Sequence, residues 1–191
     1  MLINGGSSGK GQITVQNSGS ILGGTGSAAA AVSIVNSGTL NAGNNVGVGG
    51  ASSTVGTLSV GALTLDSKGL AVFNLNSGNI HDRLLADGAI SLGGSTLTLN
   101  VNSSTTAYTV GQTLVLFRAG SDGLSGTFND FTNNGLYSYG ADTFRANYTA
   151  LQFILPVTSV TPVPEPATWL GGLWLLALCG YRRCRRRVRV A

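Results

Sequence analysis

A turn motif recurs along this 191-residue chain together with the strand pattern that precedes it. Residues 17–19 read Asn-Ser-Gly, and residues 36–38 repeat this tripeptide 19 positions later. Residues 76–78 repeat it again, a further 40 positions on, which equals two steps of 20. The apolar residues before the first two copies keep the same offset: Ile13 and Val15 map onto Val32 and Ile34. A repeat of this length with one turn per copy favours a solenoid of stacked coils.

A second repeat supports this interpretation with a longer period. Gly61-Ala-Leu-Thr-Leu65 is matched by Gly88-Ala-Ile-Ser-Leu92, 27 positions later. Apolar residues alternate with polar ones throughout residues 12–101, as expected for strands with one buried face. Asn, Ser, Gly and Asp separate these runs and suit turns that need positive φ. We predict an all-β body, a right-handed parallel β-helix; a β-sandwich with glycine-rich turns is the alternative that alternation does not exclude.

Charge is scarce and unevenly distributed. Charged residues make up 9% of the chain, against roughly 25% in an ordinary soluble domain. The net charge is +4, but six of the eleven basic residues lie within residues 182–191. The rest of the chain holds five basic and seven acidic residues, too few cations for a nucleic-acid-binding face. We therefore expect no nucleic-acid partner.

Aromatic residues are concentrated in the second half of the body. Residues 1–107 contain only Phe73, whereas residues 108–153 contain nine aromatic side chains. A solenoid needs an atypical terminal coil that closes its hydrophobic column. We interpret residues 107–155 as this cap, with Phe117, Phe128, Phe144 and Phe153 sealing the column. An aromatic platform for binding sugars is the alternative.

The C-terminal region differs from the body in composition. Residues 156–163 form an uncharged linker after a body that we place at residues 1–155. Residues 167–180 are free of charge, and a helix over this segment rises about 21 Å, short of the roughly 30 Å bilayer core. We predict a short transmembrane helix that includes Trp169, Leu170, Leu173, Trp174, Leu175, Leu176 and Leu178. A basic cluster follows it: Arg182, Arg183, Arg185, Arg186, Arg187 and Arg189. These arginines predict a cytoplasmic C-terminus and a body on the outer side of the membrane.

Pro164, Glu165 and Pro166 stand immediately before this apolar segment. Together with the short helix and the arginine cluster, they resemble the PEP-CTERM sorting signal of Gram-negative bacteria, which here covers residues 164–191. The resemblance implies recognition and processing by an exosortase. It also implies an inner-membrane stage, followed by delivery to the cell surface or to a biofilm matrix where exopolysaccharide is a partner.

The body resembles autotransporter-type β-helix repeats. The resemblance rests on Gly23-Gly-Thr-Gly26, on the glycine- and asparagine-rich run from Val32, and on Gly123-Leu-Ser-Gly-Thr-Phe128. It implies a right-handed parallel β-helix. The first eight residues lack the charged and apolar regions of a signal peptide. We therefore expect a chain truncated at its N-terminus, with a signal and upstream coils missing.

Residues able to carry out chemistry are few. His81 is the only histidine, and it is followed by Asp82 and Arg83. A Ser-His-Asp triad needs an aspartate that orients the histidine ring from across the site, and the side chain of an adjacent residue on a strand points the other way. We therefore expect no catalytic triad at His81. Asp66 and Asp87 are 21 positions apart and, with Asp82, could stack on neighbouring coils as a carboxylate cluster. Cys179 and Cys184 have no further ligands nearby, so we expect no metal site, and no cofactor.

Two classes of function remain open. The first is a non-enzymatic surface or matrix protein delivered by the sorting signal, which we favour. The second is a polysaccharide-active β-helix enzyme on the same route. The enzyme requires acidic side chains brought together at an exposed groove, whereas isolated aspartates in turns favour the non-enzymatic protein.

Overall fold

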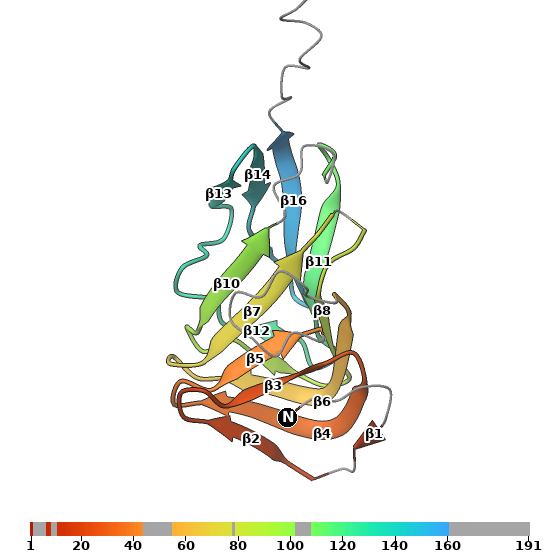
Figure 1. Ribbon diagram of the computed structural model, residues 1–191, viewed down its shortest axis with the longest axis vertical. Helices are drawn as coiled ribbons and strands as arrows, with labels where there is room; N and C mark the ends of the chain where they lie inside the picture. Colours follow the sequence, from red (N-terminus) through yellow and green to blue (C-terminus); the bar gives the residue numbers. More distant parts are fainter. Residues whose placement is uncertain (2–6, 9–10, 44–54, 78, 102–107, 161–191) are drawn as a thin grey trace, which may run out of the picture. The chain divides into compact units, whose positions relative to one another are not determined.

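The computed structural model describes residues 1, 7–8, 11–43, 55–77, 79–101 and 108–160 (Figure 1). Every regular element in these ranges is a β-strand, so this part of the protein is all-β. Residues 1–160 form a compact unit of their own, separate from residues 161–191. The strands are β1 (Ser7–Ser8), β2 (Ile13–Gln16), β3 (Ile21–Gly24), β4 (Ser27–Val35), β5 (Thr39–Ala42), β6 (Thr57–Leu65), β7 (Leu70–Leu75), β8 (Arg83–Ala86), β9 (Ile90–Ser91), β10 (Thr96–Val101), β11 (Thr113–Arg118), β12 (Leu124–Ser125), β13 (Leu136–Tyr139), β14 (Asp142–Arg145), β15 (Asn147–Tyr148) and β16 (Gln152–Val160).

The strands form two sheets that the chain visits in alternation. The four-stranded sheet runs β3-β5-β7-β10, and all of its pairs are parallel. The larger sheet holds β1, β2, β4, β6, β8, β9, β11 and β12, also in parallel pairs. Its last strands, β16, β14, β13 and β15, are antiparallel. We call one passage of the chain through both sheets a round. Each parallel pair therefore joins strands from consecutive rounds.

The register confirms the two repeats seen in the sequence. Ile13 pairs with Val32 and Val15 with Ile34, as the shorter offset predicts. Leu63 pairs with Ile90, as the longer offset predicts. The prediction for residues 76–78 is wrong, because Asn76 and Ser77 follow the end of β7, whereas the turn that corresponds to residues 36–38 precedes it. The Gly38 carbonyl accepts a hydrogen bond from the Leu70 N–H, so its neighbour in the next round is Gly69. The rounds differ in length, so a constant period of about 20 residues does not predict the position of the turn before β7.

The turn residues adopt the backbone conformations that their types favour. Asn17, Asn36 and Ser37 have φ values of 72°, 49° and 70°, in the left-handed region that Asn tolerates better than most residues. The Asn17 N–H donates to the Asn36 carbonyl at 3.0 Å, so the two turns stack directly. Ala28–Ala31, which are good helix formers, lie within strand β4 instead. Packing of alternate residues therefore overrides their helical preference.

A glycine column forms one corner of this unit. The Gly88 N–H donates to the Gly61 carbonyl, and the Gly120 N–H donates to the Gly88 carbonyl, at 2.6 and 3.0 Å. A Cβ at Gly61 would overlap with the Ala29 carbonyl, and one at Gly120 with the Asp87 carbonyl. The corner therefore needs glycine because the backbones of consecutive rounds come too close for a side chain.

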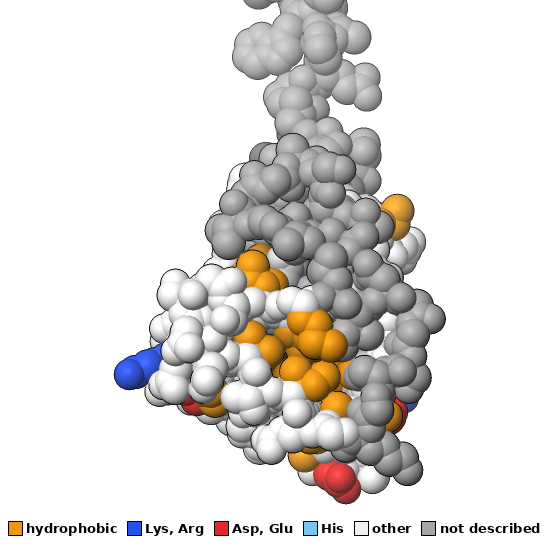
Figure 2. Space-filling model, turned by 60° about the horizontal axis from the view of Figure 1, so that its bottom comes forward, with side chains coloured by type: hydrophobic (Ala, Val, Ile, Leu, Met, Phe, Trp, Pro, Cys, Tyr) orange, Lys and Arg blue, Asp and Glu red, His pale blue; other side chains and the backbone are white. Residues whose placement is uncertain are grey.

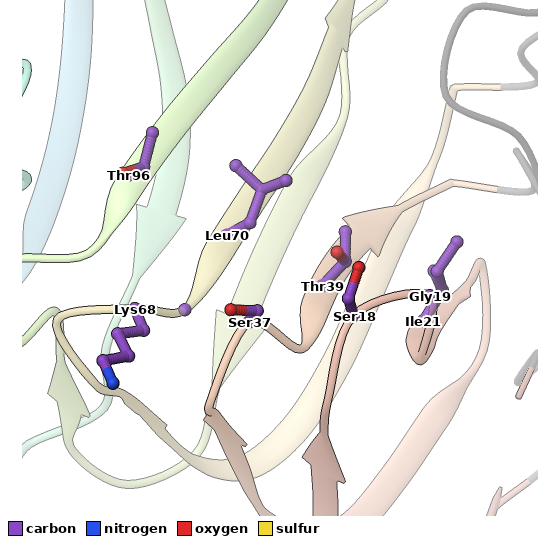
Figure 3. A pocket seen from close by; sticks show the side chains of 9 residues that line it. Ser18, Gly19, Ile21, Ser37, Thr39, Lys68, Leu70 and Thr96 are labelled. Atoms are coloured by element: carbon purple, nitrogen blue, oxygen red, sulfur yellow. The ribbon is translucent and has the colours of Figure 1, made fainter.

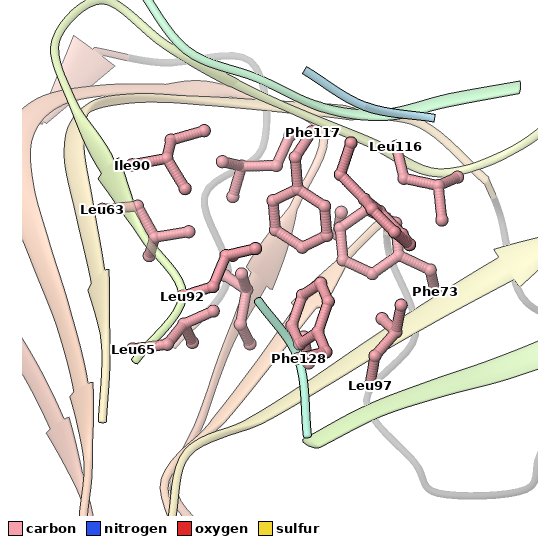
Figure 4. Close-up of a cluster of buried hydrophobic side chains, with 14 of the residues drawn as sticks. Leu63, Leu65, Phe73, Ile90, Leu92, Leu97, Leu116, Phe117 and Phe128 are labelled. Atoms are coloured by element: carbon pink, nitrogen blue, oxygen red, sulfur yellow. The ribbon is translucent and has the colours of Figure 1, made fainter. Parts of the chain in front are cut away.

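A continuous hydrophobic column fills the space between the sheets (Figure 4). Leu22, Leu40, Ala71 and Leu97 stack in the four-stranded sheet, and each is at most 3% exposed. Ile34, Leu63, Leu65, Ile90 and Leu92 face them from the larger sheet and are also buried. Burying a side chain such as Leu or Ile stabilises a fold by about 1.5–3 kcal/mol relative to leaving it exposed. No single round could exclude water from these residues, so the column depends on stacking.

Aromatic side chains form the part of the core around β11. Phe117 contacts Phe73, Phe128 and Phe153 with ring centroids 4.7, 5.4 and 6.3 Å apart. Phe144 packs edge-on against Tyr108 at 5.2 Å. The four phenylalanines assigned to a cap are all at most 2% exposed. Rings buried in this way belong to the core, whereas a sugar-stacking platform needs exposed ring faces.

The body extends further along the chain than the sequence indicates. Strand β16 continues to Val160, so the assignment of residues 156–160 to a linker is wrong. Pro156 pairs with Thr113, Val157 with Phe144 and Val160 with Asp142. Proline is tolerated at position 156 because one side of β16 has no paired residue there among the described strands. On that side β15 pairs as far as Ile154 and β14 begins to pair at Val157, whereas β11 lies on the other side. The predicted transmembrane helix lies outside the described residues.

Candidate functional site

The residues of the predicted sorting signal lie outside the described part of the chain. This applies to Pro164–Pro166, to the apolar residues 167–180 and to the arginines of residues 182–191. Within the described residues, none of the secondary structure is a helix capable of crossing a bilayer. The membrane and sorting assignments therefore stay predictions from sequence.

A groove of about 470 Å³ crosses the start of the four-stranded sheet (Figure 3). Ile21, Thr39, Leu70 and Thr96 line it from consecutive strands, and each is paired in register with the next. Stacking of rounds therefore brings residues that are far apart in sequence into one row. The turns before these strands complete the lining with Ser18, Gly19, Ser37, Lys68 and Gly69.

The side chains of this groove are hydroxyls, aliphatic groups and one ammonium. Its polar side chains are the hydroxyls of Ser18, Ser37, Thr39 and Thr96 and the exposed ammonium of Lys68. Leu70 lies between Thr39 and Thr96 in register, so these two threonines are two strand spacings, roughly 9.6 Å, apart. Among the described residues, the lining includes no carboxylate and no histidine, and Lys68 is its one ionisable side chain. Such a row can donate and accept hydrogen bonds along an extended polar ligand.

The buried carboxylate of Asp82 joins three separate segments of the body. Asp82 Oδ1 accepts a hydrogen bond from the Gly56 N–H at 2.9 Å, and Oδ2 accepts from both the N–H and the side-chain amide of Asn74 at 2.8 Å. Asn74 Oδ1 in turn accepts from the Asn100 amide at 3.0 Å, and the two residues are paired in register. This polar chain fixes the start of β6, the end of β7 and β10 relative to one another.

Burial determines the protonation of Asp82. The side chain is 0% exposed, and loss of water raises its pKa to about 6, although its three hydrogen bonds favour the charged form. The sequence suggests Asp82 as a member of a carboxylate cluster stacked on neighbouring coils. The structure instead places it inside the fold, as an acceptor for backbone and amide groups.

His81 is also buried, at 4% exposure, and lies next to Arg83 and β11. Its Nε2 atom is 3.2 Å from Arg83 Nε and 3.3 Å from the Val115 carbonyl oxygen. The Arg83 Nε–H can donate to Nε2, or a protonated Nε2 can donate to the Val115 carbonyl, but one ring nitrogen cannot do both at once. This arrangement holds the start of β8 against β11 and presents no histidine at a groove.

The other acidic residues of the body are separated. Asp66 accepts hydrogen bonds from the Asn36 and Lys68 N–H groups, and the Asn36 N–H is the main reason that its pKa is lowered. Asp130 accepts from the Leu97 N–H at 3.2 Å, and Asp87 is exposed. Across the described ranges, no three His, Cys, Asp or Glu residues come together as a possible metal site. The predicted stack of Asp66, Asp82 and Asp87 is therefore not formed.

Sequence reasoning missed the Asn74–Asn100 pair. The two asparagines are 26 positions apart, the same offset that relates Leu70 to Thr96 in the pairing of β7 with β10. Alignment of these two strands could have found them, but neither strand contains the glycine and serine that mark the other repeats.

The sequence of this chain was compared with protein-family profiles and with curated protein sequences. No protein-family profile matches it, and no curated protein sequence is significantly similar. The assignment of a function therefore rests on the residues and geometry above.

Proposed function

We propose that this chain is an exported, non-enzymatic surface or matrix protein with a right-handed parallel β-helical body and a C-terminal sorting signal. An exosortase recognises Pro164, Glu165 and Pro166 and processes the chain at the inner membrane of a Gram-negative bacterium. The body then reaches the cell surface or the extracellular matrix. The observation that carries this proposal is the ordered succession of Pro-Glu-Pro, an uncharged segment and six arginines in residues 164–191.

The strand registers support a β-helical body. Leu63 lies between Val32 of the preceding round and Ile90 of the following one, and Leu70 lies between Thr39 and Thr96 in the same way. A sandwich of hairpins would instead pair consecutive strands antiparallel. Right-handed crossovers are the rule for parallel strands, in about 98% of cases. Both sheets together therefore favour a coil that winds in one direction.

The disposition of the acids supports a structural role for the body. The carboxylates of Asp66, Asp82 and Asp130 accept hydrogen bonds from main-chain N–H groups of other strands or turns. Such carboxylates stabilise turns and strand ends, and they are not available as a pair at a groove. The row of hydroxyls in the Ser18–Thr96 groove suits contact with a hydroxyl-rich polymer such as an exopolysaccharide.

Replacing Pro164, Glu165 and Pro166 with alanine tests the sorting route. In a Gram-negative host with an exosortase, the variant should stay in the inner-membrane fraction with an epitope tag after Ala191 still attached. Pro162→Ala, just before the motif, is the matched control and should be processed normally. Processing of the triple-alanine variant at the normal rate would contradict the sorting proposal.

Cross-linking tests the β-helical body independently of sorting. Ser33 and Thr64 are outward-facing partners on adjacent rounds, so cysteines at both positions should react with one short bifunctional reagent. Cys179 and Cys184 are first replaced by serine, which leaves no other thiol. The matched control joins Ser33 with Thr98, an exposed residue of the four-stranded sheet. Equal yields from the two pairs would count against stacked rounds.

A further inference from the structure

The hydroxyl groups of the Ser18–Thr96 groove are not used inside the protein. In the described part of the chain, the side chains of Ser18, Ser37, Thr39 and Thr96 make no hydrogen bond. Thr39 is the most informative of them, because it is only 7% exposed and a buried hydroxyl is ordinarily bonded within the protein. Its remaining access is to the groove that it lines (Figure 3). The groove therefore holds donors and acceptors that are left for a ligand.

The main chain beneath the centre of the groove is already paired. β5 lies between β3 and β7, and β7 lies between β5 and β10, so Thr39 and Leu70 have paired residues on both sides. A peptide that binds as an added strand needs unpaired N–H and C=O groups at a sheet edge. An occupant of this row bonds to side chains instead. Because Thr39 and Leu70 belong to inner strands, a further strand beside β3 would lengthen the row and would not cover it.

Apolar and hydroxyl side chains alternate along the row. Ile21, Thr39, Leu70 and Thr96 follow one another in register from strand to strand. A sugar ring offers the same two kinds of group, because its faces carry C–H bonds and its edges carry hydroxyls. The volume of about 470 Å³ also lies within the roughly 300–1,000 Å³ of small-molecule sites. The row therefore suits consecutive sugar units of an extended chain.

Lys68 gives this groove a positive charge on a body that is otherwise acidic. The described ranges hold six aspartates and four basic side chains, whereas the lining holds Lys68 and no acid. Figure 2 shows one end of the body, where charged side chains are few among uncharged ones. Asp66 interacts electrostatically with Lys68, but its oxygens accept hydrogen bonds from the Asn36 and Lys68 N–H groups, and it does not line the groove. An exposed ammonium among hydroxyls favours a ligand that carries carboxylates.

We propose that this groove binds an acidic polysaccharide, in which a sugar carboxylate pairs with Lys68 and sugar hydroxyls bond to Thr39 and Thr96. The inference rests on the proposed role at the cell surface or in the matrix, and it specifies the chemical class of the exopolysaccharide and the side chains that hold it. A neutral polysaccharide would use the hydroxyls and leave Lys68 without a partner of opposite charge on the ligand.

A linear oligogalacturonate and its fully methyl-esterified form test this proposal, because the ester keeps the ring hydroxyls and loses the charge. The arginines of residues 182–191 would also attract an acidic chain, so every measurement uses the full-length chain with these six arginines replaced by glutamine, in a mild detergent. Calorimetric titration gives the dissociation constants. The acid should bind about three- to fivefold more tightly than the ester. K68Q should abolish this difference, and T39V should weaken the binding of both ligands by about fivefold.

R118Q and T64V are the matched controls. Arg118 and Thr64 are exposed residues of the larger sheet and do not line the groove, so both variants should bind as the parent chain does. T96V repeats the test of the hydroxyls if T39V does not fold. No binding, equal affinity for acid and ester, a K68Q chain that still prefers the acid, or unchanged binding after loss of the threonine hydroxyl overturns the proposal. The purified chain meets no exosortase, so such a result is distinct from a failure of the sorting experiment.

Discussion

Asn74 donates two hydrogen bonds to one oxygen of the buried Asp82 carboxylate, from its backbone N–H and from its side-chain amide, both at 2.8 Å. The two residues flank the loop after β7, so this contact closes the loop at its base. The second carboxylate oxygen reaches the Gly56 N–H of the preceding round. The Asp82 carboxylate thus connects the loop after β7 with the preceding round. Its protonation should therefore change the free energy of unfolding.

Asp82→Asn should remove a pH dependence from the free energy of unfolding. Burial raises the pKa of Asp82 to about 6 in the folded protein, whereas an unfolded aspartate titrates near about 3.9. The folded state therefore binds this proton more tightly, and the resulting stability is present below about pH 4 and lost as the pH rises through 6. Between pH 4 and 7 the wild type should lose about 2 kcal/mol from this group. Urea titrations at several pH values should show that the variant lacks this loss.

Asp87→Asn is the control for that experiment. Asp87 is exposed, and its substitution removes one carboxylate without altering the hydrogen bonds of Asp82. Burial also raises the pKa of Asp142, which adds a slope of the same sign to the wild type and to both variants. Only the difference between the wild type and Asp82→Asn is therefore diagnostic. Parallel curves for these two proteins would show that Asp82 does not titrate as proposed.

Phe117→Ala should destabilise the fold by about 3–5 kcal/mol, the usual cost of such a cavity. Phe117 is 0% exposed and packs against three other phenylalanine rings, one of them Phe73 on β7. Denaturant unfolding measures the change. Leu136→Ala removes apolar atoms from a side chain that is 60% exposed and should change stability by less than about 0.5 kcal/mol. Similar losses for the two variants would argue against an aromatic core at this position.

Gly120→Ala should be destabilising by about 1–3 kcal/mol, because its Cβ would overlap with the Asp87 carbonyl and force the two rounds apart. Gly11→Ala is the matched control, since a Cβ at Gly11 meets no atom within 4 Å. Thermal unfolding of the two variants compares a corner glycine with an unconstrained one. If Gly120→Ala is as stable as Gly11→Ala, close approach of the backbones does not limit this corner.

Replacing the six arginines of residues 182–191 with glutamine should weaken the orientation of the proposed membrane segment. Basic residues beside a transmembrane helix keep that end in the cytoplasm. Cys184 lies among these arginines and serves as a reporter. In intact spheroplasts it should not react with a membrane-impermeant maleimide in the wild type, but should react in the glutamine variant. Labelling of the wild type before permeabilisation would contradict a cytoplasmic C-terminus.

Local pattern in the sequence predicted the strands and part of their register. Alternation identified Ile13 with Val15 and Leu63 with Leu65 as buried faces, and the two repeat offsets predicted their partners. These predictions were correct because side chains alternate between the two faces of a strand, and because identical turns stack on one another. The copy at residues 76–78 failed because a short motif does not reveal how long each round is.

Buried polar residues could not be recognised from sequence. The residues on either side of Asp82 in the sequence are typical of a surface turn. Only the closure of the loop after β7 brings its carboxylate to Gly56 and Asn74. The groove from Ser18 to Thr96 likewise depends on the register of four strands. Both features combine residues from different rounds, whose spacing is set by turn and loop lengths.

The sequence by itself determined the all-β character of the body, the residues that alternate into its core and the distinct composition of residues 164–191. Tertiary structure alone decided that the Asp82 carboxylate lies inside the fold and that the body continues through β16 to Val160. The physical reason is that side-chain alternation is a local property of the backbone. Burial and pairing, in contrast, depend on which distant segments the stacking brings together.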